Sequence, residues 1–149
     1  MPIRKALVPV DGSEVSLKAA ALAAQFAAKH EWDILLFHVL EHVPMPDFAF
    51  PDGVKEKTLR DLREQSRQVL AQAKEVFDTA GVGAKTKLVE GLAAQAIIAE
   101  AERCDIVVLG STGMGHGSLG SLLLGSVAED VIRKVKAAIL LVKEESTID

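Results

Sequence analysis

The feature that most restricts the fold of this chain is a set of five short apolar segments, spaced along its whole length. They span residues 3–10, 33–40, 84–89, 105–110 and 137–142. The last two contain Ile-Val-Val-Leu and Ala-Ile-Leu-Leu-Val, in which apolar residues follow one another without alternation. Continuous apolar strands are typical of a parallel sheet that is covered on both faces. Helices are therefore expected between the strands.

The stretches between these segments carry helical patterns. Apolar residues recur at helical spacing in 14–29, 55–80, 92–103 and 127–135, and the first of these forms a narrow, Ala-rich stripe. This alternation predicts an α/β fold, a single doubly wound five-stranded parallel sheet with helices on both faces and right-handed crossovers. At 149 residues the chain has the length of one ordinary domain, so we expect one domain over 1–149.

Composition limits the partners and the compartment. The longest apolar run near the carboxyl end is far shorter than the roughly 20 residues that cross a bilayer, and the amino terminus shows no apolar signal core. We therefore expect a cytoplasmic protein that does not bind membranes. The net charge of -4, with scattered cations, argues against a nucleic-acid partner. Cys104 is the only cysteine, which excludes an internal disulfide, and we expect it to be a packed residue before a strand.

Two loops are expected where ligands bind in open α/β sheets, outside the carboxyl ends of the strands. The first holds Pro9, Val10 and Asp11 and runs directly into a helical pattern. The second, 110–126, has six glycines in seventeen residues. Such a loop lets backbone amides turn toward an anion and lets phosphate oxygens approach without a Cβ in the way.

The end of the second loop reads Ser126-Val-Ala-Glu129, which fits a capping box. This predicts that Ser126 caps a helix whose free amides and positive dipole end face the glycine-rich loop. An anion site would result. The alternatives are a plain helix cap at Ser126 and a loop whose glycines only confer mobility.

Together these residues resemble the ATP-binding universal stress proteins, which carry the motif G-x2-G-x9-G-(S/T). The chain supplies Gly110, Gly113, Gly125 and Ser126, but eleven residues instead of nine separate Gly113 from Gly125, and counting nine back from Gly125 gives Gly115. The resemblance extends to Val-Pro-Val-Asp-Gly-Ser at 8–13, to His-Val at 38–39 and to the run at 122–129. It spans nearly the whole chain.

The resemblance implies a Rossmann-like fold and a stress-response protein that binds ATP, or another adenine nucleotide, and senses or signals. It implies that Pro9, Val10 and Asp11 line the adenosine end, that Val39 offers backbone hydrogen bonds to adenine, and that Leu109 and Gly110 form the floor. The residues expected at ribose and phosphates are Gly113 or, in the shifted register, Gly115, with Gly125, Ser126 and Val127. Asp11 would hold Mg²⁺ directly or through water; the alternative is a turn former before the helix.

Other chemistries fit less well. No Lys or Arg lies between Gly110 and Ser126, so the loop is not of the Walker type. The match of 115–120 to G-x-G-x-x-G does not follow a strand directly, which argues against an NAD-linked oxidoreductase. Hydrolysis needs a base and cations near the developing charge, and only Asp11 and His116 are candidate bases. We assign no catalytic residue; slow ATP hydrolysis and a nucleotide-free interaction module remain alternatives.

The last strand-like segment predicts self-association. Residues 138–142 are expected at a sheet edge, and neither a proline nor an inward charge interrupts them. Antiparallel pairing of this strand with its own copy gives an interface that closes at two subunits. The family resemblance implies the same homodimer. The alternative is that the strand is covered by the helices of its own chain.

Overall fold

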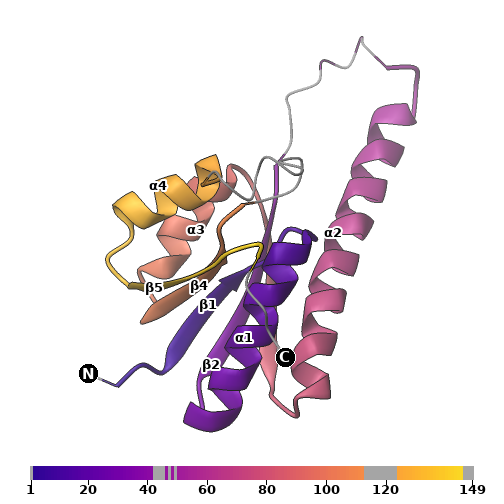
Figure 1. Ribbon diagram of the computed structural model, residues 1–149. Coiled ribbons are helices and arrows are strands. Elements are labelled where there is room, and N and C mark those ends of the chain that lie inside the picture. Colours follow the sequence, from indigo (N-terminus) through magenta and orange to yellow (C-terminus); the bar gives the residue numbers. More distant parts are fainter. Residues whose placement is uncertain (1, 42–45, 47, 49, 113–123, 146–149) are drawn as a thin grey trace.

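The computed structural model describes residues 2–41, 46, 48, 50–112 and 124–145. Strands and helices alternate along these residues (Figure 1). In chain order they are β1 (Lys5–Pro9), α1 (Glu14–His30), β2 (Asp33–Leu40), α2 (Val54–Thr79), β3 (Ala84–Glu90), α3 (Ala93–Ala101), β4 (Ile106–Gly110), α4 (Ser126–Lys134) and β5 (Ala138–Val142).

The sheet has five parallel strands in the order β3-β2-β1-β4-β5. The chain therefore winds from β1 outward to β3 and then returns past β1 to build β4 and β5. This is the predicted doubly wound fold, which is confirmed. The first strand is shorter than predicted, because β1 pairs with β2 only from Lys5 to Pro9.

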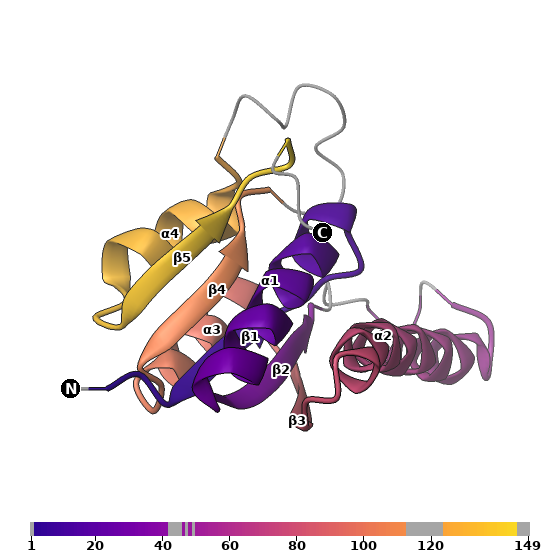
Figure 2. The ribbon, with the colours of Figure 1, turned by 60° about the horizontal axis from the view of Figure 1, so that its bottom comes forward.

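Helices cover both faces of the sheet, with α1 and α2 on one face and α3 and α4 on the other (Figure 2). Alternate residues of a strand point to opposite faces, so β1 divides its side chains between two cores. Val8 packs under α1 and α2, whereas Leu7 packs under α3 and α4. Both side chains are fully buried, as expected for a strand covered on both sides.

The Ala-rich stripe of α1 lies against the sheet, as predicted. Ala19, Ala20 and Ala23 are fully buried, and their small side chains bring the helix axis close to β4. The helix begins after Ser13, whose Oγ accepts the N–H of Ser16 at 3.2 Å. This cap fixes the start of α1 directly beyond the carboxyl end of β1.

The two sheet edges differ in character. β5 forms one edge, as predicted, and its middle residues Ile139, Leu140 and Leu141 are partly buried. β3 forms the other edge and exposes the charged or polar side chains of 85–87.

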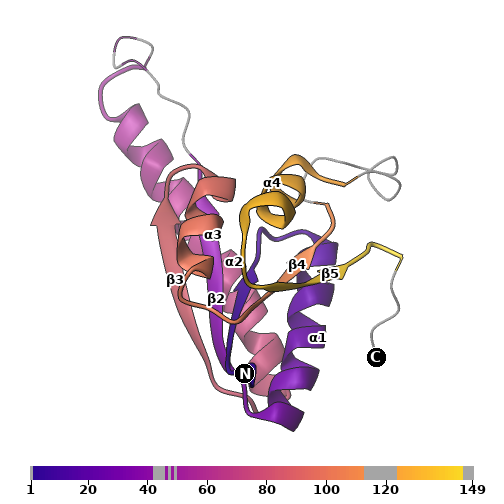
Figure 3. The same ribbon diagram turned by 90° about the vertical axis from the view of Figure 1, so that its left-hand side faces the viewer.

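α2 is longer than the sheet, and its first turns extend past the carboxyl ends of the strands (Figures 1 and 3). Within the described ranges, no helix is long and apolar enough to span a membrane.

Candidate functional site

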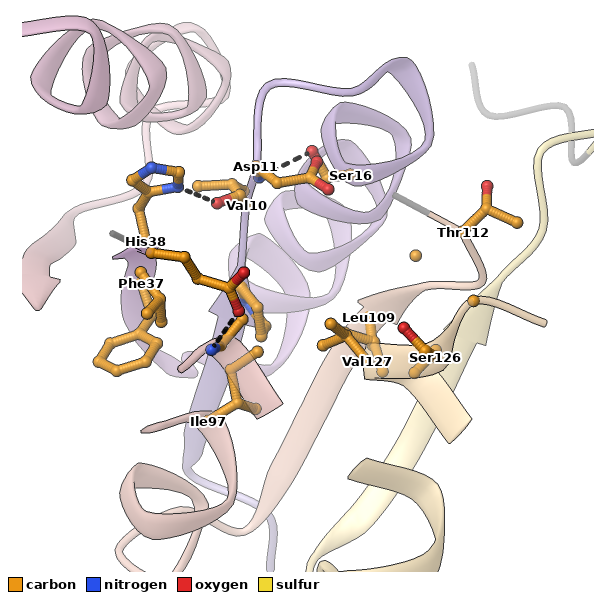
Figure 4. A pocket seen from close by; sticks show the side chains of 17 residues that line it. Val10, Asp11, Ser16, Phe37, His38, Ile97, Leu109, Thr112, Ser126 and Val127 are labelled. Carbon is orange, nitrogen blue, oxygen red and sulfur yellow. Dashed lines mark hydrogen bonds between the residues drawn. The ribbon is translucent and has the colours of Figure 1, made fainter. Parts of the chain in front are cut away.

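A pocket with a volume of about 360 Å³ lies at the carboxyl edge of the sheet. Its walls come from the ends of β1, β2 and β4 and from the first residues of α3 and α4 (Figure 4). In the sheet, β1 lies between β2 and β4. The chain runs from β1 to β2 on one side and later returns to β4 on the other, so the pocket opens where the winding direction changes.

The pocket brings together most of the residues that the sequence singled out. Those that line it are Pro9, Val10, Asp11, Val39, Leu109, Gly110, Gly125, Ser126 and Val127. Gly113, Gly115 and His116 lie outside the described residues. The lining residues that the sequence analysis did not assign to the site are Ser16, Phe37, His38, Glu41, Ala93, Ile97, Thr112 and Ala128.

Asp11 is held by a turn that also caps α1. Its Oδ1 accepts hydrogen bonds from the N–H of Ser13 at 2.9 Å and from the hydroxyl of Ser13 at 2.5 Å. The N–H of Asp11 donates to Ser16 Oγ at 3.3 Å. Gly12 between them has φ +87°, a conformation that glycine adopts without strain. Asp11 is therefore a turn former, which was the alternative interpretation, and it also borders the pocket.

His38 fastens the end of β2 to the end of β1. Its Nδ1 lies 2.7 Å from the carbonyl oxygen of Val10, and because a carbonyl can only accept, Nδ1 is the donor in this hydrogen bond. The N–H of Val10 donates in turn to the carbonyl of Phe37 at 2.8 Å. These two bonds hold the rims of the pocket in place where the β1–β2 ladder ends. Figure 4 shows His38 and Phe37 on the side opposite Ser126 and Val127.

Gly110 has a packing role in addition to its place in the pocket. A Cβ at this position would lie 3.1 Å from Val15 Cγ1 and 3.3 Å from the backbone nitrogen of Ser16. The first turn of α1 therefore occupies the space that a side chain would need. The sequence analysis related this glycine to the ligand alone, whereas the contact with α1 requires it even without a ligand.

The start of α4 differs from the predicted capping box. Gly125 is the N-cap, with φ −65° and ψ 153°, and it makes no side-chain cap bond; Ser126 is already the first helical residue. The reason is that Gly125 N–H donates to the carbonyl of Ser111 at 2.8 Å, which keeps Gly125 outside the helix. Glu129 pairs with Arg133 at 2.7 Å instead of reaching back to Ser126. The capping-box prediction is wrong.

The first three amides of α4 nevertheless belong to residues that line the pocket. The first N–H that bonds within the helix is that of Glu129, to the carbonyl of Gly125 at 2.9 Å. The amides of Ser126, Val127 and Ala128 precede it, and all three residues line the pocket. Within the described part of the chain these three N–H groups have no acceptor, so together with the positive end of the helix dipole they suit an anion.

Glu41 is a site residue that was not singled out from the sequence. Its Oε1 accepts the N–H of Ala93, the first residue of α3, at 2.7 Å. The rule that selected the ends of the first and fourth strands applies equally to the end of the second, where Glu41 follows Leu40. Applying that rule to every strand end would have found it.

The electrostatics of the pocket are dominated by acids. Among the described lining residues there are two carboxylates, Asp11 and Glu41, one histidine, and neither Lys nor Arg. In the described part of the chain no three His, Cys, Asp or Glu side chains gather into a possible metal site.

The fold and the site define a doubly wound α/β protein with a ligand-sized pocket at its switch point. A family model described as the universal stress protein family matches residues 2–143, and the chain belongs to this family. A universal stress protein from Methanocaldococcus jannaschii is 33% identical over 143 residues, which cover 95% of this chain and 82% of that protein.

Two solved structures are similar over nearly the full length. Universal stress protein UspA from Lactobacillus plantarum has a TM-score of 0.81 at 21% identity, over 96% of this chain and 99% of that chain, which shows the common fold. A universal stress protein solved in complex with cAMP has a TM-score of 0.66 at 25% identity, over 95% of this chain and 98% of that chain.

Proposed function

We propose that this protein binds an adenine nucleotide, ATP foremost, and acts as a stress-response sensor or signalling module in the cytoplasm. The observation that carries the proposal is that one pocket combines apolar walls for a base with the orphan amides of α4 for a phosphate. A volume of about 360 Å³ suits a small-molecule ligand. The cAMP complex of a relative supports an adenine nucleotide as the ligand class.

The backbone of Val39 is suited to hydrogen-bond a base edge. Phe37 directs its carbonyl toward β1, where it accepts from Val10, and Leu40 directs its carbonyl toward the far side, where it accepts from Gly91 at 3.0 Å. Backbone groups alternate sides along a strand, so the N–H and C=O of Val39 face the β1 side. The β1–β2 register ends there at Pro9 and Phe37, which supports a donor–acceptor pair directed at the pocket.

We further propose that Mg²⁺ accompanies the nucleotide. A phosphate chain at α4 would share the pocket with the carboxylates of Asp11 and Glu41, and no Lys or Arg among the described lining residues offsets that charge. Oxygen ligands from a carboxylate and from phosphates are those that Mg²⁺ prefers. Asp11, directly or through water, is the residue proposed to hold it.

Titration calorimetry with ATP, AMP and GTP, each with and without Mg²⁺, tests both proposals. We expect binding of the adenine nucleotides over GTP and a strong Mg²⁺ dependence for ATP. Asp11→Asn keeps an oxygen acceptor for Ser13 but removes the charge, so it should leave the fold intact and abolish most of the Mg²⁺ dependence. Asp130→Asn, which neutralises an acid of α4 outside the pocket, is the control. Absence of binding to wild type would favour a nucleotide-free module.

We also propose a homodimer through Ala138–Val142. At the β5 edge, apolar side chains flank backbone N–H and C=O groups that can pair with another strand. At the β3 edge, the charged side chains of Lys85 and Lys87 disfavour such pairing. Sedimentation equilibrium should give a dimer for wild type and a folded monomer for Leu140→Lys, with Thr86→Lys on the β3 edge as the matched control. A wild-type monomer at micromolar concentration would refute the proposal.

A further inference from the structure

Two helices direct their amino-terminal ends at the same pocket. Ala93 and Ile97 of α3 line one side of it, and Ser126 and Val127 of α4 line another. Each helix has nine residues and a positive dipole end. The phosphate of a ligand could therefore bind at either helix end. The ligand binds in one orientation only if one of the two ends is unavailable to the phosphate.

The end of α3 is already occupied by a carboxylate of the protein. Its own cap residue, Leu92, offers no side-chain hydrogen bond. Glu41 supplies one from another part of the chain, with Oε1 2.7 Å from the nitrogen of Ala93. The backbone bond from Gly91 N–H to the carbonyl of Leu40, at 3.0 Å, ties the segment before Glu41 to the segment before α3. The Glu41 side chain is thereby held at α3, and the residue before it is tied to the segment before α3.

The start of α4 is different in this respect. Its cap residue is Gly125, which has no side chain, and no side-chain cap bond is made there. The amides of Ser126 and Val127 lead the helix and line the pocket. One helix end thus carries a built-in anion, and the other presents its amides to the pocket.

We propose that Glu41 is a specificity-determining residue that acts as the internal anion of α3 and directs the phosphate of the ligand to α4. This inference rests on the proposed nucleotide function and deepens it. A phosphate near α3 would meet a like charge on Glu41 and would have to compete for an amide that is already bonded. The same carboxylate accepts hydrogen bonds only, so the Glu41 side of the pocket suits the uncharged, N–H-bearing base.

If Glu41 only caps α3, a different result is expected. Its loss would lower the stability of the helix, and neutralising its charge while keeping the cap bond would leave the affinity for AMP unchanged. The charge and the cap function are separated by Glu41→Gln, which keeps an oxygen acceptor for the Ala93 N–H and removes the charge. Glu41→Ala removes both. Glu102→Gln, at the other end of α3, is the control for net charge.

The experiment is a titration of ¹⁵N-labelled protein with inorganic phosphate and, separately, with AMP, followed by amide chemical shifts. In wild type and Glu102→Gln, phosphate should shift Ser126 and Val127 and leave Ala93 in place. In Glu41→Ala it should also shift Ala93 with saturation. In Glu41→Gln the affinity for AMP should rise by roughly five- to tenfold, because a like charge has been removed from the pocket.

Two results would overturn the proposal: a wild-type shift of Ala93 by phosphate equal to that in Glu41→Ala, or phosphate and AMP responses in both Glu41 variants identical to those of wild type. Failure of the nucleotide function has a different signature, since wild type would then ignore AMP altogether. The release of Ala93 toward inorganic phosphate in Glu41→Ala would still be expected, so the two failures are distinguishable.

Discussion

Gly110→Ala separates the packing role of this glycine from its place in the pocket. The added Cβ would lie 3.1 Å from Val15 Cγ1 and 3.3 Å from the carbonyl carbon of Val15, whereas carbon atoms in contact prefer about 3.5 to 4.0 Å. The neighbour is in part backbone of α1, which cannot move by a rotamer change. Overpacking of this kind costs about 1 to 3 kcal/mol.

Part of that cost is offset, because Ala restricts the unfolded chain and stabilises by about 0.4 to 1 kcal/mol. Taking the middle of each range, a net loss of about 1.3 kcal/mol remains, which lowers Tm by about 3 to 5 °C for a chain of this size. Gly83→Ala is the matched control, since a Cβ there meets nothing within 4 Å. Thermal unfolding of the nucleotide-free protein measures both. Equal Tm values for wild type and Gly110→Ala would refute the packing argument.

Three further predictions concern single side chains. Lys87 Nζ lies 2.6 Å from Glu100 Oε1 and holds the pKa of the buried Glu100 below its ordinary value of 4.5. This contribution to stability is present above pH 4.5 and is lost as pH falls through the lowered pKa. In urea unfolding, the free energy of unfolding of Glu100→Gln should therefore fall less steeply at acid pH than that of wild type. Burial raises the pKa of the Cys104 thiol, so its alkylation by iodoacetamide at pH 7 should be slow in the native protein and fast in urea; equal rates would contradict this. Ser126→Ala should cost less than about 0.5 kcal/mol in chemical denaturation, because Ser126 is not the cap; a loss near 1 kcal/mol would restore the capping-box interpretation.

Much of the fold could be predicted because its signals are local. The continuous apolar runs of β4 and β5 and the Ala-rich face of α1 can each be recognised within a short stretch of sequence. The alternation of strands and helices then leaves few possible topologies. The ends of individual strands, such as β1, could not be predicted to the residue. A strand ends where its pairing with the neighbouring strand ends, and the apolar residues can continue beyond that point. The expected start of α4 at Ser126 is confirmed, but its cap was assigned to Ser126 instead of Gly125. The bond from Gly125 to Ser111 is a contact between segments, which no local pattern shows.

The candidate site was predicted in outline. Asp11 follows from the end of the first strand, and Val39 and Leu109 follow from the family resemblance; both signals are visible in the sequence. The dual role of Gly110 was not visible, because it depends on how closely α1 approaches β4. Glu41 was missed because the strand-end rule was applied only to the first and fourth strands. Its bond to Ala93, more than fifty residues away, has no local sequence pattern.

The central claim is that the carboxyl-edge pocket holds an adenine nucleotide with its phosphates at α4. A crystal structure of the protein grown with ATP and Mg²⁺ tests it most directly. We expect adenine against Val39 and Leu109, phosphates at the amides of Ser126 and Val127, and the metal beside Asp11. Two results would contradict this claim. The nucleotide could occupy instead the cavity at the amino-terminal ends of the strands, lined by Ile98, Val135 and Ala137 among others, or its phosphates could lie at α3.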